Sequence, residues 1–304
     1  MTTPAKNPRL WTPRYWLAWL GIASIWLAAR LPRRALLALG ADLGDILGRL
    51  SGPRQRIAAR NLALCYPHME ANARDQLLRR NMRDMGIMLG EFSLGWMGSK
   101  RALKRIPVHI EGLHHLESLR AQGRGAMLVG GHFSHLELCA RLVSREIRIA
   151  GMYRRMDNPV FERVVLRARL GYAAAMFTKD DVLGCVRYLR RGGILWYAPD
   201  QDMRSKDHVF APFFGIPAAT ITATHHLARL SGAAVVPFFH RREDDGSYTM
   251  RLEAPLDQFP SSDVVADTTR VNAAIERMVN AAPEQYLWAH KRFKTRPSGN
   301  PALY

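Results

Sequence analysis

Residues 125–144 read "GAMLVGGHFSHLELCARLVS", in which an apolar run meets two glycines and a histidine before a helical pattern begins. The run is typical of a buried strand, and the segment "LELCARLVS" (136–144) is typical of a helix. Similar apolar runs bounded by Gly or Pro follow at 147–153, 192–199 and 232–239. The chain therefore repeats a strand and a helix in alternation.

Helical patterns between or beside these runs are "NPVFERVVLRARLG" (158–171), "DDVLGCVRYLRRG" (180–192) and "AATITATHHLARLSG" (218–232). Strands that alternate with helices predict an α/β fold with a central, largely parallel sheet flanked by helices. Residues 52–100 are rich in Arg, Leu and Met and predict further helices. We expect a membrane anchor or interfacial helix at 1–35 and one domain at 36–304, divided into a helical membrane-proximal part (36–110) and an α/β catalytic core (111–304).

The charge of the chain is strongly positive. The 304 residues contain 44 Lys+Arg against 26 Asp+Glu, a formal net charge of +18. Such a surplus favours polyanionic partners: nucleic acid, an anionic membrane or a phosphorylated substrate. No nucleic-acid-binding motif accompanies the charge, so nucleic acid is not an expected partner. Cys65, Cys139 and Cys185 lack disulfide or zinc spacing, and no metal is expected.

The N-terminal segment from Tyr15 to Ala29 carries no charge and lies between Arg14 and Arg30. As a helix it would span roughly 22 Å at 1.5 Å per residue, which is short of the ~30 Å hydrocarbon core. Its tryptophans are typical of membrane interfaces. The segment predicts a membrane anchor that either spans the bilayer or lies in its interface, with the main body on the cytoplasmic side; a buried hairpin of the globular domain is the alternative.

His132 and Glu137 allow two interpretations. Ser134 and Glu137 match the capping-box pattern, in which both side chains cover helix N–H groups. Alternatively, His132 lies where the carboxyl end of a parallel strand opens a site, and Glu137 folds back to hold its ring. Such a pair suits general base catalysis, because the carboxylate fixes the tautomer and stabilises the imidazolium.

The motif H-F-S-H-L-E at 132–137 resembles the H-x4-D/E motif of the glycerolipid acyltransferase superfamily. More narrowly, the chain resembles the lipid A biosynthesis acyltransferases, the lauroyl and myristoyl transferases of the inner membrane. The stretches that carry this resemblance are "PRYWLAWLGI" (13–22), "ARNLALCYP" (59–67), "YRRMDNP" (153–159), "WYAPDQD" (196–202), "VFAPFFG" (209–215), "LARLSGA" (227–233) and "PEQYLWAHKRFKTRP" (283–297).

The resemblance implies a glycerolipid-acyltransferase-like fold and transfer of a fatty acyl chain from acyl carrier protein to a hydroxyl of Kdo2-lipid IVA or a similar lipid A precursor. It makes His132 the base and Glu137 its orienting partner. The chain has no G-x-S-x-G nucleophile elbow, so direct transfer without an acyl-enzyme is expected, with no cofactor. The expected place of action is the cytoplasmic face of the inner membrane.

Further residues are expected to bind the substrate or the developing charge. The oxyanion formed by attack on the thioester needs fixed donors, and the backbone N–H groups of Gly131 and Phe133 are candidates. The expected substrate-binding residues are Arg154, then Asn158, Asp200 and Gln201 as the resemblance implies, and Arg292 and Lys294 of the basic run 290–296. For Asp200, a turn or a tether to an arginine is expected rather than acid–base chemistry. Two alternatives stay open: an acyltransferase for another glycolipid, and a basic membrane-binding protein without catalysis.

Overall fold

The computed structural model describes residues 10–50, 52–203 and 207–304. The N-terminal part is helical and begins with a short 3₁₀ turn (Pro13–Tyr15). Its helices are α1 (Trp16–Ala28), α2 (Arg33–Arg49), α3 (Pro53–Cys65), α4 (Ala71–Met97) and α5 (Lys100–Lys104). The prediction of helices over 52–100 is confirmed by α3 and α4.

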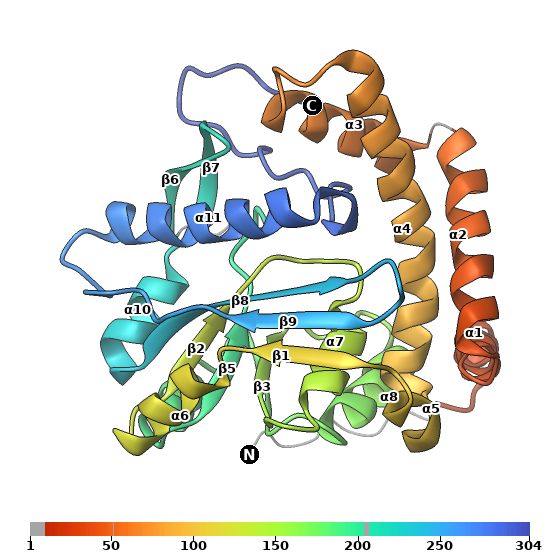
Figure 1. Ribbon diagram of the computed structural model, residues 1–304, viewed down its shortest axis with the longest axis horizontal. Coiled ribbons are helices and arrows are strands. Elements are labelled where there is room, and N and C mark those ends of the chain that lie inside the picture. The colour runs from red at the N-terminus through yellow and green to blue at the C-terminus, as the bar shows by residue number, and fades with distance from the viewer. Residues whose placement is uncertain (1–9, 51, 204–206) are drawn as a thin grey trace.

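The main sheet has the strand order β1-β9-β8-β2-β5-β3-β4. All neighbouring strands are parallel except β8 and β9 (Figure 1). The bounds are β1 (Val108–Glu111), β2 (Ala126–Val129), β3 (Ala150–Tyr153), β4 (Met176–Thr178), β5 (Ile194–Tyr197), β8 (Ala234–Arg242) and β9 (Tyr248–Leu252). The predicted α/β architecture with a largely parallel sheet is confirmed.

The helices of this part are α6 (Leu113–Ala121), α7 (Leu136–Val143), α8 (Pro159–Leu170), α9 (Val182–Arg190), α10 (Ala223–Ser231) and α11 (Val264–Ala281). A separate antiparallel hairpin consists of β6 (His208–Phe213) and β7 (Ile216–Ile221). The helix predicted over 218–232 is therefore wrong in its first residues. Phe214 and Gly215 both have positive φ, which is the geometry of a tight hairpin turn, and this turn commits the following residues to a strand.

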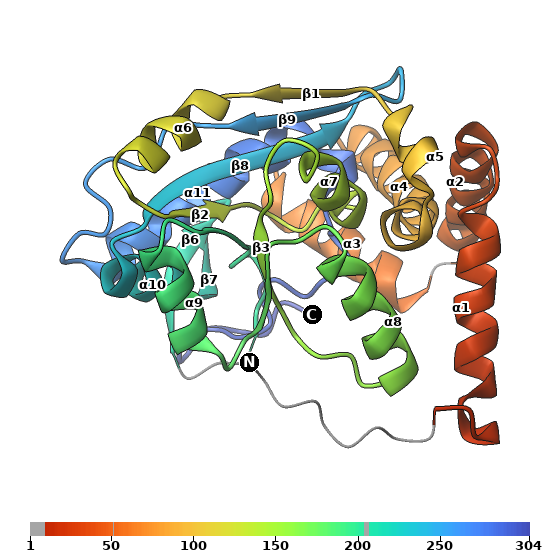
Figure 2. The same ribbon diagram turned by 90° about the horizontal axis from the view of Figure 1, so that it is seen from below.

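The two faces of the sheet bury different cores. Along β2, Met127 packs in the cluster that contains Ile275 of α11, while Leu128 packs in the cluster that contains Leu138 of α7. This alternation follows from the two-residue period of a strand. Both faces are therefore covered, and Figure 2 shows β1, β9, β8 and β2 in this order across the sheet. In an open α/β sheet a ligand binds beyond the carboxyl ends of the strands, which here are the loops that follow β2 and β5.

Helix α4 connects the N-terminal helices to this edge of the sheet. A Cβ added at Gly86 would collide with the backbone of Gly40 and Gly44 of α2, so the two helices can approach closely only with glycine there. Further along α4, a Cβ at Gly95 would lie 2.9 Å from the carbonyl carbon of Glu137. Close packing thus fixes α7 against α4.

Large apolar side chains remain exposed on α1 and α2. Leu17 is 84% exposed, and Trp16, Leu20, Leu27, Leu39, Ile46 and Leu47 are exposed as well. Within the described ranges, no helix combines the length and the apolar character that crossing a bilayer requires. Of the two placements predicted for residues 1–35, the spanning one therefore finds no support, and the interfacial one stays a prediction. Residues 1–9 of that segment lie outside the described residues.

Candidate active site

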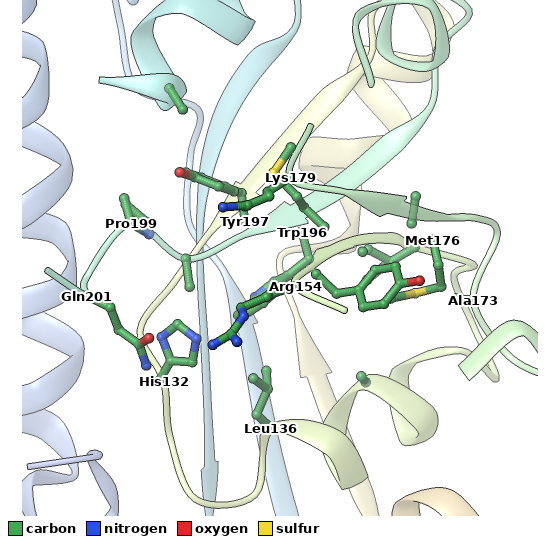
Figure 3. Close-up of a pocket in the computed structure, with 18 of the residues that line it drawn as sticks. His132, Leu136, Arg154, Ala173, Met176, Lys179, Trp196, Tyr197, Pro199 and Gln201 are labelled. Carbon is green, nitrogen blue, oxygen red and sulfur yellow. The ribbon is translucent and has the colours of Figure 1, made fainter. Parts of the chain in front are cut away.

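His132 lies in the loop between β2 and α7, at the edge of a cleft with a volume of about 890 Å³. The side chain of His132 is 28% exposed. The cleft is lined mainly by apolar side chains of α7, β3, β5 and α10. Figure 3 shows the imidazole beside Gln201, with Arg154 reaching toward it from the opposite side. The predicted position of His132 at a strand end is confirmed.

The imidazole of His132 is held by Asp200. His132 Nδ1 lies 2.6 Å from Asp200 Oδ1, and the backbone N–H of His132 donates to Asp200 Oδ2 at 2.8 Å. Tyr286 donates its hydroxyl to the same Oδ2 at 3.0 Å. With Nδ1–H donating to the carboxylate, the neutral ring keeps Nε2 as its proton acceptor. This is the arrangement of a general base and its orienting carboxylate.

Burial and mutual charge act in opposite directions on the pKa values of His132 and Asp200. Burial lowers the pKa of His132, but the charge of Asp200 and its hydrogen bond outweigh burial, so the pKa lies above its ordinary value. Burial raises the pKa of Asp200, whereas His132 and Tyr286 together lower it to about 2. Asp200 is therefore ionised at any physiological pH and stabilises the protonated imidazole.

Asp200 reaches His132 because β2 and β5 are parallel neighbours. Val129 at the end of β2 is paired with Tyr197 at the end of β5, and the chain leaves both strands at the same edge. The predicted role of Asp200 in substrate binding is wrong, since its side chain is only 1% exposed and lies beneath the imidazole. The rule that placed His132 at this edge also applies to Asp200, which follows the apolar run 194–197.

The C-terminal segment completes the support of the loop. Ser134 N–H donates to the carbonyl oxygen of Gln285 at 2.9 Å, and Leu287 N–H donates to the carbonyl oxygen of His132 at 3.0 Å. Asn81 of α4 donates to the carbonyl oxygens of Glu284 and Tyr286, each at 2.8 Å. Helix α4 therefore fixes Tyr286, which in turn orients Asp200. No pattern in the sequence predicted these contacts.

Glu137 does not contact His132, so its predicted role as the orienting partner is wrong. Its carboxylate pairs with Arg169 of α8 and accepts a hydrogen bond from Trp96 Nε1 at 2.7 Å and from the Tyr172 hydroxyl at 3.4 Å. The capping-box alternative is wrong as well, because α7 begins after His135 without any side-chain cap. Glu137 instead connects α4, α7 and α8.

The other predicted binding residues divide into two groups. Arg154 and Gln201 line the cleft, as a substrate contact requires. Arg292 is buried, and its guanidinium donates to Ala219 O and Thr220 Oγ1, so the prediction that it binds substrate is wrong. Two further residues lie elsewhere: Asn158 caps α8 through Val160 N–H, and Lys294 is exposed outside the cleft.

Gly131 and Phe133 of this loop are the predicted oxyanion donors. Among the described residues, no acceptor is bonded to the N–H groups of Gly131 and Phe133, whereas Ser134 N–H is occupied by Gln285. A Cβ at Gly130 would lie 2.7 Å from the carbonyl oxygen of Phe238, so glycine is needed for the loop to pass this strand. Both residues are buried and neither lines the cleft, so their role as oxyanion donors stays a prediction.

Within the residues that the structure describes, one buried cluster has side chains that can bind a metal. The ligand atoms of His135, Cys139 and His240 lie within 4.8 Å of one another. His135 Nε2 is 3.0 Å from the carbonyl oxygen of His240. Burial, and after it the charge of Arg242, lowers the pKa of His135 to about 3. The cluster packs against Phe133 and Tyr248 in the core.

Comparison with known proteins adds the following. The family described as "Bacterial lipid A biosynthesis acyltransferase" matches residues 3–295. A lipid A biosynthesis lauroyltransferase of Escherichia coli (strain K12) is 38% identical over 303 residues, covering 99% of both chains. A palmitoleoyltransferase of the same pathway and organism is 36% identical, covering 96% of this chain and 95% of the relative. The corresponding myristoyltransferase is 29% identical, covering 96% and 91%.

Among solved structures, the 1-acyl-sn-glycerophosphate (LPA) acyltransferase PlsC from Thermotoga maritima overlaps 83% of this chain and 98% of that chain. The TM-score is 0.38 and the identity is 12%. That overlap is too loose to support a conclusion about the site.

Proposed function

Because the chain belongs to the bacterial lipid A biosynthesis acyltransferase family, we propose that it transfers a fatty acyl chain from acyl carrier protein to a hydroxyl of a lipid A precursor such as Kdo2-lipid IVA. The observation that carries the mechanism is the pair formed by His132 and Asp200 at the edge of a largely apolar cleft. The acyl-carrier thioester is the co-substrate, and the reaction requires no cofactor.

The proposed reaction is a direct transfer. His132 Nε2 removes the proton from the acceptor hydroxyl as its oxygen attacks the thioester carbonyl carbon, which forms a tetrahedral oxyanion. The intermediate collapses, the carbon–sulfur bond breaks, and the imidazolium returns the proton to the leaving carrier thiolate. Asp200 stabilises the imidazolium through this cycle. An acyl-enzyme is not needed, and all three cysteines are buried.

The oxyanion is stabilised by the N–H groups of Gly131 and Phe133. Both lie in the loop between β2 and α7. Two backbone hydrogen bonds hold this loop, because Ser134 N–H donates to the carbonyl oxygen of Gln285 and Leu287 N–H donates to that of His132. Donors fixed in this way cost no reorganisation when the charge develops, which is the source of their catalytic effect. Support for this role is the absence of a competing acceptor within the described residues.

The anionic glycolipid is bound by cations at the cleft. Arg154 and Lys179 line it, and Arg154 is exposed although it also pairs with Asp157 at 2.7 Å. Guanidinium groups bind phosphate through two parallel hydrogen bonds. The net charge of +18 adds a general attraction for phosphorylated lipid and for an anionic bilayer.

We place the chain at the cytoplasmic face of the inner membrane, with α1 and α2 in the lipid interface. This placement is supported by the exposed apolar side chains of both helices, among them Leu17, Leu20 and Leu47. A contiguous exposed apolar surface on a folded protein marks contact with a membrane or a partner, and helices that lie in the interface bury such a face among the headgroups.

The experiment is acyl transfer by the purified full chain from acyl carrier protein thioesters to Kdo2-lipid IVA, followed by mass spectrometry of the lipid. We expect product with the wild type and a loss of about 10²–10⁴-fold in His132→Ala. His109→Ala, which removes an exposed histidine on β1, is the matched control and should keep the wild-type rate. Vesicle cosedimentation should be equal for all three proteins.

Three outcomes would contradict the proposal in different ways. Transfer that persists in His132→Ala excludes this residue as the base. Product formed only on a different glycolipid acceptor changes the substrate. Vesicle binding without product from any acceptor indicates a non-catalytic membrane-binding protein.

A further inference from the structure

The residues that line the cleft differ in chemistry between its two sides. One side is made by α7, β3 and the chain between α8 and β4, and its lining side chains include Leu136, Ala140, Val143, Ile149, Ala173 and Met176. We call this part the α7–β3 slot. The other side, which we call the polar side, carries Lys179, Asp180, Thr222 and His226 between the apolar Ile221, Leu227 and Leu230. The ionisable groups on the slot side, Glu137 and Arg169, pair with each other.

Resting on the proposed function, we propose that the α7–β3 slot holds the acyl chain of the donor and that Ala173 and Met176 at its far end set the longest chain accepted. Figure 3 shows Ala173 and Met176 on the side of the cleft opposite His132, with Leu136 below the imidazole. A thioester carbonyl beside His132 therefore directs its chain along this apolar surface toward Met176.

An apolar lining favours a hydrocarbon chain because burial of each methylene raises the binding constant about fourfold. The slot has room for one because small residues occupy several lining positions, namely Ala140, Gly151 and Ala173. Polar groups on the other side would lose hydration against such a chain without gaining a partner. The polar side therefore suits the glycolipid better than the donor chain.

The end of the slot is defined by a contact between β3 and β4. A Cβ added at Gly151 would lie 3.2 Å from both the sulfur and the methyl carbon of Met176, so the thioether packs directly on the glycine backbone. Ala173 is only 6% exposed and lies three residues before Met176. A larger side chain at Ala173 shortens the available length, and a smaller one at Met176 extends it.

The polar groups next to the slot are already satisfied by one another. Glu137 pairs with Arg169, and Trp96 and Tyr172 donate to the same carboxylate. Their charges are therefore compensated before any ligand binds, and their contacts hold α4, α7 and α8 together around the slot. A preformed apolar site avoids the cost of ordering on binding.

The test compares initial rates of Ala173→Phe, Met176→Ala and the wild type with acyl carrier protein thioesters of increasing chain length. We expect Ala173→Phe to reduce the rate with long chains relative to short ones by about 10-fold, and Met176→Ala to increase that ratio by a similar factor. Ala223→Phe, a change of the same size on the polar side of the cleft, is the matched control and should leave the chain-length order unaltered.

The outcomes separate this inference from the proposed function. A wild type that acylates nothing defeats the proposed function itself. A wild type that transfers, with folded Ala173→Phe and Met176→Ala variants that keep its chain-length order, overturns the slot assignment. A shifted order in Ala223→Phe instead places the donor chain on the polar side and also overturns it. If Ala173→Phe does not fold, Met176→Ala still tests the slot assignment, because it should raise the rate with long chains relative to short ones.

Discussion

Asp200 and Glu137 are both buried carboxylates near the loop that follows β2, and they meet different cations. Asp200 holds an imidazole, whose charge can change during a reaction. Glu137 holds the guanidinium of Arg169 and accepts from Trp96 and Tyr172. A carboxylate that faces a permanent cation and two neutral donors keeps the same partners throughout a reaction, so its role is to stabilise the fold. A carboxylate that faces a titratable ring can serve proton transfer.

The largest effect is expected from Asp200→Asn. The amide removes the charge that stabilises the imidazolium, and we expect kcat to fall by about 10²–10⁴-fold. The charge of Asp200 is also what raises the pKa of His132 against burial. In Asp200→Asn this charge is lost while burial still lowers the pKa of His132. Because the base is active only when it is deprotonated, the acid limb of the kcat/KM profile moves to lower pH. A wild-type rate in Asp200→Asn would show that the pair is not catalytic.

A smaller and different effect is expected from Glu137→Ala. The substitution leaves Arg169, whose side chain is 18% exposed, without its anion, and breaking such a pair costs about 3 kcal/mol of unfolding free energy. Denaturant unfolding measures this loss. Because Glu137 does not touch His132, the remaining activity should keep the wild-type acid limb.

Glu137→Gln serves as the control for that prediction. The amide oxygen can still accept the hydrogen bond from Trp96, so the loss of stability should be smaller than in Glu137→Ala. A shifted acid limb in either Glu137 variant would contradict the separation of the two carboxylates.

The smallest effect is expected from Tyr286→Phe, which removes one hydrogen bond worth about 1 kcal/mol. Tyr286 disperses the charge of Asp200, so its loss leaves more charge acting on His132 and raises the pKa of the imidazole. The acid limb should therefore move to higher pH, opposite to the shift in Asp200→Asn. The kcat/KM profile distinguishes the two, and a shift in the same direction for both would contradict this account.

The sequence identified much of the site's location correctly. Apolar runs predicted β2, β3, β5 and β8, and the glycines before His132 placed it at a strand end. The family resemblance is confirmed by a match over residues 3–295. These features depend on local pattern, which a single sequence displays directly.

Local sequence pattern did not identify the carboxylate that holds His132. Glu137 is close in sequence, but the start of α7 at Leu136 carries its side chain toward Arg169 of α8. Asp200 is distant in sequence and becomes a neighbour only through the pairing of β2 with β5. The same holds for Arg292, which looks like part of a basic surface run and lies buried against Ala219 and Thr220.

The sequence by itself therefore determined the α/β class, the partly exposed histidine at the end of a strand, and membership of the family. Tertiary structure alone decided which carboxylate holds the imidazole, and it did so because strand order, not chain distance, brings charged groups together. It also decided that Asn81 and Tyr286 support the site, since hydrogen bonds between distant segments leave no periodic trace in the sequence.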